Sequence, residues 1–179
     1  ASRFLLMNME GYTPGAPVAE TAADAWMFSR LAKASRSVTE GIEQYTFGEM
    51  ARGVQTFFWN EVCDWYIEIT KGRLNDESTR LQAQRNLIFV LDASLRLMHP
   101  LMPFVTEAIW DTMPASWLDV DPATGEASRA DALIVAAWPE PDALAQYVDE
   151  DAERSFELLR TVVTAARSTR ARYRLSPRE

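Results

Sequence analysis

Residues 57–68, FFWNEVCDWYIE, are the stretch that decides the predicted fold. At about 100° per residue, the charged side chains here and just beyond fall on one stripe, at Glu61, Asp64, Glu68 and Lys71. Most of the remaining circumference is aromatic, aliphatic or cysteine. A helix that is apolar over most of its circumference must be covered on several sides. The stretch therefore predicts an all-α fold with this helix in the middle of a helical bundle.

Apolar residues recur at helical spacing on both sides of this stretch. Residues 1–10 have the pattern of a helix end, which Gly11 stops. The remaining patterns predict helices over about 20–45, 47–72, 77–98, 103–113 and 149–173. These amphipathic helices supply the covering that the central helix needs.

Local signals indicate where these helices begin. Thr46 and Glu49 have the spacing of a capping box, which predicts the start of the central helix near residue 47. Asn75 or Asp76 can cap the next helix. Three predicted buried faces follow from the spacing: Leu87, Ile88, Leu91, Leu95 and Met98; Phe104, Ala108 and Trp110; and Phe156, Leu159, Val163 and Ala166.

The part between the fourth and fifth of these helices has little periodicity. Residues 114–130 contain prolines, a glycine and a serine and are predicted to form a loop. Residues 133–136, Leu-Ile-Val-Ala, could form at most one short strand, because no second strand of similar quality exists to pair with it. We therefore expect one domain over 1–179, with a helical bundle at about 1–113, a loop and short extended segment at 114–148, and a basic helix at 149–174.

Length and composition are typical of one well-buried globular domain, with 179 residues of which 47% are hydrophobic. Ala1 opens the sequence without an initiator methionine, and we expect the chain to be a piece of a longer protein. No run of about 18 apolar residues could span a bilayer. The single cysteine, Cys63, excludes an internal disulfide, which agrees with a reducing cytoplasm. Together with the only histidine, His99, it cannot supply three or four zinc ligands.

No residue pattern in the chain predicts a catalytic site. Glu61, Asp64 and Glu68 have no histidine or glycine-rich loop beside them, so we expect them to accept hydrogen bonds from arginines of neighbouring helices. Cys63 lies in the middle of a helix, where a thiol is not activated as a nucleophile. His99 precedes Pro100, which ends a helix, and we expect it to fill a tight corner between two helices.

Charge is distributed unevenly along the chain. The formal net charge of −8 argues against a protein coated in cations for nucleic acid. The last predicted helix is nevertheless acidic at its start and basic at its end, with Arg160, Arg167, Arg170 and Arg174 forming a cationic stripe. Such a stripe suits a phosphate backbone. The same polarity also fits the helix macrodipole, which favours acids at the start and cations at the end.

Four stretches resemble one known family, in the order in which that family has them. Residues 57–71, FFWNEVCDWYIEITK, resemble the central helix of the anticodon-binding domain of valyl-tRNA synthetases, which are class I aminoacyl-tRNA synthetases. Residues 1–4, ASRF, are similar to the end of that family's WNASRF segment. Residues 97–107, LMHPLMPFVTE, are similar to its LxHPxMPFxTE turn, and residues 137–139, AWP, to its short strand. The resemblance covers essentially the whole chain.

The resemblance implies the anticodon-binding helical bundle of class Ia synthetases. The parent enzyme would attach valine to tRNA(Val) with ATP and Mg²⁺, while this part binds no cofactor and no metal. The chain has neither the HIGH motif nor the KMSKS loop, so the catalytic and editing domains are absent from it. The implied partners are the anticodon stem-loop of tRNA(Val) and the parent's catalytic domain, with no membrane. We expect the fragment to be monomeric and cytoplasmic.

The resemblance also implies where the RNA would lie. Arg3 and Phe4 match the place where the bundle meets the anticodon, offering a cation and a ring on which an unstacked base can stack. The arginine segment of the last helix matches a family segment at Arg167 and Arg170 and would position the stem through its phosphates. The full set of predicted nucleic-acid-binding residues is Arg3, Phe4, Arg30, Lys33, Arg167, Arg170 and Arg174.

Other interpretations remain open at the level of sequence. Phe4 could be packed with Arg3 solvated, and Arg30 and Lys33 could belong to a solvated helix face. The chain could instead come from a related isoleucyl or leucyl synthetase, which share the helical fold. An acidic, aromatic-rich bundle is also typical of a protein-interaction module that docks a partner helix in a groove.

Overall fold

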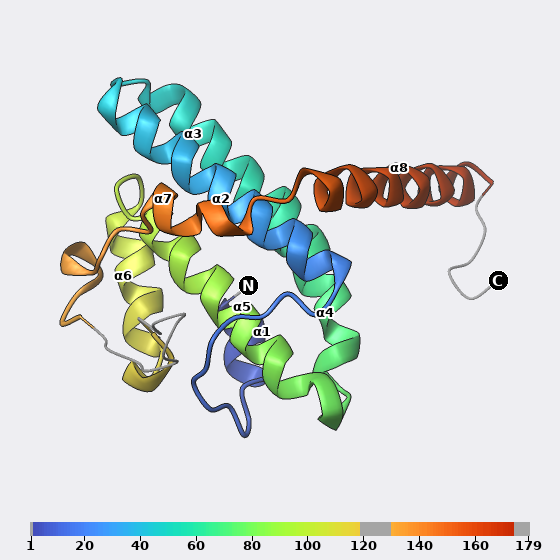
Figure 1. The fold of residues 1–179 in the computed structure, drawn as a ribbon, viewed down its shortest axis with the longest axis horizontal. Helices are drawn as coiled ribbons and strands as arrows, with labels where there is room; N and C mark the ends of the chain where they lie inside the picture. The colour runs from blue at the N-terminus through green and yellow to red at the C-terminus, as the bar shows by residue number, and fades with distance from the viewer. Residues whose placement is uncertain (1, 119–129, 174–179) are drawn as a thin grey trace.

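The structure, a computed structural model, describes residues 2–118 and 130–173. These two parts contain helices and no strand (Figure 1), which confirms the all-α prediction. Within them, no helix is both long and apolar enough to cross a membrane. The elements are α1 (Ser2–Met7), α2 (Ala22–Glu43), α3 (Phe47–Gln55), η1 (Thr56–Tyr66), α4 (Ile67–Leu74), α5 (Glu77–Met98), α6 (Pro103–Thr112), η2 (Ala115–Trp117), η3 (Leu133–Val135), α7 (Pro141–Leu144), η4 (Ala145–Tyr147) and α8 (Glu150–Arg172).

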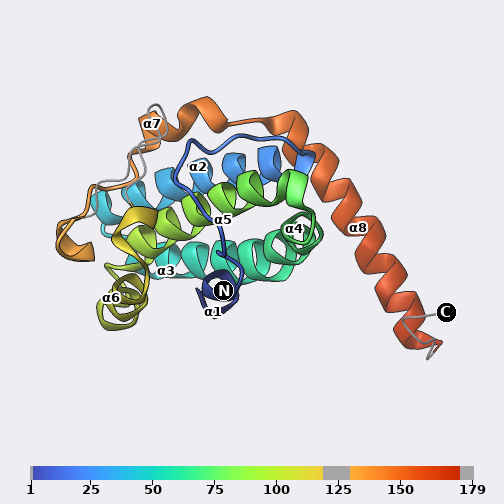
Figure 2. The same ribbon diagram turned by 90° about the horizontal axis from the view of Figure 1, so that it is seen from below.

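Three long rods form the bundle: α2, the continuous rod α3–η1–α4, and α5. The rods α2 and α5 lie next to each other, and α3–η1–α4 runs beneath them in the view of Figure 2. The short α1 packs against α5. The helix α6 lies at one end of the bundle, and α8 projects from the other end (Figures 1 and 2).

The core consists of the faces that these rods turn toward one another. The predicted face of α5 is buried at all five positions. The largest fully buried side chains of the described parts are Trp26, Trp110, Tyr66, Phe28, Leu5, Met27, Leu31, Leu87, Ile88, Leu91, Leu95 and Leu97. Asp76 caps α5 through the backbone N–H of Ser78, one of the two predicted caps.

The predicted capping box was placed at the wrong helix. Thr46 makes no side-chain cap hydrogen bond, although α3 does begin at Phe47. A cap needs extended backbone, but Thr46 has φ −90° and ψ 52°, because it follows a tight turn with Tyr45 at φ 57°. The complete capping box lies at Thr21, which has φ −128° and ψ 159° and exchanges hydrogen bonds with Asp24.

The middle of the central rod is π-helical, and this changes which side chains are covered. The backbone N–H of Ile67 bonds to the carbonyl of Val62, five residues back. Each residue of such a helix turns through less than the angle assumed for an α-helix, so the predicted stripe is displaced. Glu61 is buried, while the side chains of Trp59 and Ile69 are 48% and 39% exposed. The prediction that other helices cover the central helix on its apolar sides is wrong at these two residues.

The predicted inward face of α6 is also wrong at two of three positions. Trp110 is buried, but Phe104 is 91% exposed and Ala108 is exposed. The buried position of the first turn belongs to Thr106, because its hydroxyl bonds to the carbonyl of Met102, 2.8 Å away, and contacts His99. A polar side chain that satisfies its own hydrogen bonds can take an inward position.

The possible strand at 133–136 is a single 3₁₀ turn. The N–H of Val135 bonds to Ala132, and that of Ala136 bonds to Leu133, both at 3.1 Å. With no neighbouring strand in the described parts, the backbone satisfies its groups locally. The predicted loop at 114–130 includes the turn η2, and its residues 119–129 lie outside the described residues.

The last helix, α8, has the predicted length, but the bundle does not bury all of its predicted apolar face. Its cap is Asp149, whose carboxylate accepts from the N–H of Ala152 at 2.8 Å. Phe156 is buried, whereas Leu159 is 48% exposed. The bundle covers α8 mainly along its first turns, because the helix then leaves it (Figure 1).

Candidate nucleic-acid interface

The first predicted contact surface is α1, a helix of six residues. Arg3 is exposed, and Phe4 is half-buried against the core. The side chain of Asn8 donates to the carbonyl of Phe4 at 2.7 Å, and Gln84 of α5 donates to the carbonyl of Asn8 at 2.8 Å. These bonds fix the short helix on α5, so the exposed Arg3 and the half-buried ring of Phe4 are held at one place.

A second cation lies beside this ring. The ammonium of Lys71 on α4 is 5.6 Å from the centroid of Phe4 and 2.6 Å from the carboxylate of Glu68. A lysine at this distance from a ring makes a cation–π contact. The arrangement brings Arg3, Phe4 and Lys71 onto one surface, although Lys71 is 67 positions further along the chain than Phe4.

The structure places Arg30 and Lys33 in partly exposed ion pairs where α2 meets η1 and α8. Arg30 forms a two-pronged pair with Glu61, at 2.8 and 3.1 Å, and approaches Glu153 at 3.6 Å. Lys33 lies 2.9 Å from Glu153. These contacts tie α2 to η1 and to the start of α8. The side chains of Arg30 and Lys33 remain 33% and 39% exposed, so both are partly solvated while they pair with acids.

The pKa shifts follow from these contacts. Burial alone would lower the pKa of Arg30, but the hydrogen bond and charge of Glu61, with those of Glu153, raise it. Burial alone would raise the pKa of Glu153, but hydrogen bonds from Ser29 and Lys33 and the charges of Lys33 and Arg30 lower it. Both groups are therefore held in their charged forms.

The second predicted contact surface is the arginine side of α8, which rests on aromatic rings. Trp65 of η1 has two guanidinium groups over its ring, those of Arg160 and Arg167, each 5.4 Å from the centroid. Below them, the ring of Phe156 stacks on Trp26 at 3.9 Å. Contacts with the bundle thus extend along α8 from Phe156 to Arg167, and further arginines follow in its last turn.

The other two predicted arginines of this surface come later in the sequence. Arg170 is half-buried near the end of α8. Arg174 lies outside the described residues. No acidic residue occurs between Glu157 and Glu179, so the outer half of α8 carries cations only.

The side chains that were considered as catalytic candidates make structural contacts or are held in an unreactive form. Glu61 is held by Arg30, which is the arginine contact predicted for it. Burial raises the pKa of the Cys63 thiol, which disfavours the reactive thiolate. Among the described residues, no group of three or more His, Cys, Asp or Glu side chains is placed to hold a metal ion.

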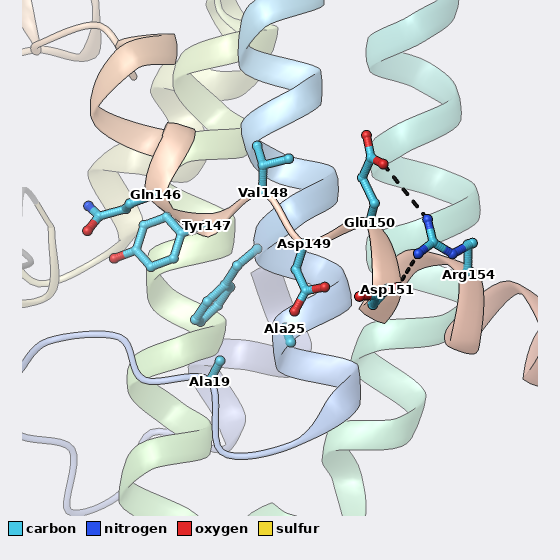
Figure 3. Close-up of a pocket in the computed structure, with 10 residues that line it drawn as sticks. Ala19, Ala25, Gln146, Tyr147, Val148, Asp149, Glu150, Asp151 and Arg154 are labelled. Carbon is cyan, nitrogen blue, oxygen red and sulfur yellow. Dashed lines mark hydrogen bonds and ion pairs between the residues drawn. The ribbon is translucent and has the colours of Figure 1, made fainter.

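A hollow of about 450 Å³ beside the start of α8 is acidic rather than suited to RNA. Figure 3 shows Asp149, Glu150 and Asp151 around it, with Arg154 joined to the last two. Asp149 is the helix cap, so these acids serve the first turn of α8, where negative charge is favoured. Polyanions are repelled from such a surface, and the hollow is not a candidate RNA site.

Sequence reasoning placed the arginines of α8 but missed what lies under them. Trp65 was expected only as part of an apolar face, and Lys71 only as part of a polar stripe. Their partners are 67 to 102 positions away in the chain, so no spacing pattern could reveal these contacts. The one available signal was the number of aromatic rings in 57–68.

Comparisons with known proteins identify the family. The family described as "Anticodon-binding domain of tRNA ligase" matches residues 24–179. The valine–tRNA ligase of Pseudothermotoga lettingae is 36% identical over 99% of this chain and 19% of its own length. Those of Symbiobacterium thermophilum and Thermotoga maritima are 40% and 39% identical over 98% of the chain and 20% and 18% of their own lengths.

The chain thus spans about a fifth of the length of the relatives that it matches. The resemblance read from residues 57–71, 97–107 and the two shorter stretches is confirmed by these matches. On the evidence of its helical architecture and of a family match that includes α2 through α8, this chain belongs to the family of anticodon-binding domains of tRNA ligases.

Proposed function

We propose that this chain binds the anticodon stem-loop of tRNA(Val) as the anticodon-reading part of a valine–tRNA ligase. The observation that carries the proposal is the placement of two cationic surfaces around α4. Arg3, Phe4 and Lys71 lie on the side of α1, and Arg167 lies over Trp65 on the side of α8. Figure 2 shows α1 and the projecting α8 flanking α4.

The two surfaces have different chemical roles in this proposal. Valine codons begin with GU, so the anticodon carries A and C at its second and third positions. Reading such bases requires them to be unstacked, held against a ring or a guanidinium plane, and hydrogen-bonded at their edges. Arg3 and Phe4 supply these groups on α1. Arg167 and Arg170 of α8, together with Arg174, which lies outside the described residues, supply phosphate contacts that position the stem.

The chemistry of aminoacylation belongs to the rest of the ligase. ATP and Mg²⁺ would be bound by its catalytic domain, which this chain does not include, and no residue of this chain is assigned a catalytic role. The chain's second partner is that catalytic domain. We place the ligase in the cytoplasm and expect the isolated domain to be monomeric. Arg30 and Lys33 contribute by orienting α8 through Glu153 rather than by contacting RNA directly.

Titration of this chain with two short RNA hairpins tests the proposal. One hairpin carries an anticodon loop ending in AC, and the other has these two bases replaced. Tryptophan fluorescence reports binding at low and at moderate salt. We expect salt-sensitive binding that prefers the AC loop. Equal affinity for both loops, or binding that is indifferent to salt, would contradict anticodon reading by this domain.

Replacing Phe4 with alanine tests the stacking role. The Phe4→Ala variant should bind the AC hairpin about 5-fold to 150-fold more weakly, the loss that corresponds to about 1–3 kcal/mol for one stacked base. The matched control is Phe47→Ala, which removes an exposed ring at the α2–α3 turn, away from α1 (Figure 1). An unchanged titration curve for Phe4→Ala would remove this ring from the site.

A further inference from the structure

An exposed apolar patch lies at the end of the bundle that is opposite to α8. It consists of Phe104 and Val105 at the start of α6, and Ile134 and Val135 in η3, which contacts α6. Their exposed fractions are 91%, 50%, 73% and 69%. Proteins that work as monomers rarely leave large apolar side chains clustered at the surface. We call these four residues the α6–η3 patch.

One hydrogen bond joins the two segments of the patch, and another holds α6 to the end of α5. The carboxylate of Glu107 on α6 accepts from the backbone N–H of Leu133 at 3.0 Å. Thr106 gives its proton to the carbonyl of Met102, so its oxygen accepts from Nδ1 of His99 at 2.8 Å. Leu133, the first residue of η3, is buried. The exposed side chains therefore stand on a backbone that is already ordered, as a preorganised docking surface requires.

A cavity of about 390 Å³ adjoins the patch. Ile134 belongs to both the cavity and the patch, and Pro103 lies next to Phe104 in the chain. Most of the cavity wall is apolar, and its one charged group, Arg96, is committed to the carboxylate of Asp92 and to a backbone carbonyl at 2.6 Å. The cavity suits an apolar side chain. Its lining residues are Arg96, His99, Pro100, Pro103, Leu133, Ile134, Ala136 and Trp138.

The charges on α6 disfavour RNA as the occupant of the patch. Helix α6 contains Glu107 and Asp111 but no lysine or arginine. The proposed RNA surfaces on α1 and α8 lie elsewhere, and α8 is at the far end of the molecule (Figures 1 and 2). An RNA bound to the surfaces on α1 and α8 would leave α6 and η3 uncovered. The occupant is therefore a protein surface of apolar character.

The comparisons indicate which protein surface is available. The valine–tRNA ligases that match this chain contain about four fifths of their length outside it. We propose that the α6–η3 patch is the surface on which an apolar segment of the remaining ligase chain packs, with one apolar side chain in the adjoining cavity. This inference rests on the proposed function in one respect, that the chain is part of such a ligase. It assigns a protein-facing end and an RNA-facing end to one domain.

Thiol labelling in two contexts tests this inference. Phe104→Cys is made in this chain and in the full-length ligase that contains it, and the rate of alkylation by iodoacetamide is followed by mass spectrometry of the peptide. We expect labelling at least about tenfold slower in the full-length ligase. The control is Phe47→Cys, at a position that is 51% exposed and away from the patch, which should be labelled at the same rate in both contexts. Equal rates at position 104 overturn the inference.

Two further outcomes identify other occupants and also overturn the inference. Labelling of the isolated chain that slows with protein concentration would show that a second copy covers the patch. Labelling of the ligase that slows only after tRNA is added would show that RNA does.

The variant Phe104→Asp provides an independent measurement. It should leave the melting temperature of the isolated chain unchanged, because the side chain contacts little, and lower that of the ligase. An unchanged melting temperature in the ligase would count against the inference. Hairpin binding by the isolated chain tests the proposed function separately. A failure of the proposed function can therefore be distinguished from a failure of the inference about the α6–η3 patch.

Discussion

Asp24 is a fully buried carboxylate in the middle of an apolar bundle, and its partners explain why it is tolerated there. Tyr66 Oη donates to it at 2.7 Å, Arg73 Nη1 donates at 2.7 Å, and Thr21 donates through its backbone and its hydroxyl. Burying a charge is costly unless it is paired and hydrogen-bonded. One residue thus joins the start of α2 to η1 and α4, and burial with the Asp24 charge raises the pKa of Tyr66.

Replacing Tyr66 with phenylalanine should destabilise the domain without creating a cavity. Asp24 would lose one buried hydrogen bond, and bonds to a charged group contribute about 1.5–3 kcal/mol each. We expect the free energy of unfolding in urea to fall by about this amount. Tyr45→Phe is the matched control, because Tyr45 is 80% exposed at the α2–α3 turn. A change in Tyr66→Phe no larger than that of the control would show that the bond contributes little.

At the scale of elements, periodicity predicted the helices well and their surroundings less well. The buried face of α5 follows from local pattern, whereas α3 begins at the predicted residue, Phe47, without the capping box from which that start was predicted. Phe104 and Leu159 were assigned to buried faces, and both are exposed. Spacing shows which side of a helix is apolar, but it contains no information on whether another element covers that side. The π-helical η1 was missed because an i to i+5 pattern leaves no distinct signal in so aromatic a stretch.

Helix α8 is joined to the bundle by charges as well as rings, and the charged part depends on pH. The pKa of Glu153 lies below its ordinary value of 4.5 in the folded protein. Its contribution to stability is therefore complete above about pH 5 and is lost as the pH falls through the lower folded value. We expect Glu153→Gln to lower the free energy of unfolding by roughly 0.5–1 kcal/mol at neutral pH, the range of partly exposed ion pairs.

The pH dependence of the difference between the two proteins is the decisive measurement. The free energies of unfolding in urea of wild type and Glu153→Gln should differ at pH 7 and converge as the pH falls below 4.5 and through the lower folded pKa of the wild-type carboxylate. Glu150→Gln serves as the control, because its carboxylate makes only a long, exposed contact with Arg154 at 3.8 Å. A difference that stays constant between pH 7 and 3 would assign the effect to packing rather than to charge.

At the scale of the whole molecule, the net charge of −8 conceals two cationic surfaces. Arg30 and Lys33 pair with Glu61 and Glu153, and the cationic surfaces on which the proposal rests are those of α1 and the outer half of α8. The sequence identified the α8 arginines, since they share one helix. It could not predict that Trp65 lies beneath Arg167, because that contact joins residues about 100 positions apart and depends on how the rods cross.

The salt dependence of RNA binding separates anticodon binding from the alternative of a groove that docks a partner helix. Removing one phosphate-binding cation reduces the slope of log affinity against log salt by about 0.7–0.9, whereas apolar docking responds little to salt. We expect Arg170→Gln to weaken hairpin binding at low salt and to reduce this slope by the amount that one phosphate contributes. Arg154→Gln removes the same charge from the acidic start of the same helix, where Arg154 pairs with Asp151 and Glu150, so its slope should equal that of the wild type. Equal slopes for all three proteins would mean that the outer half of α8 does not bind phosphates.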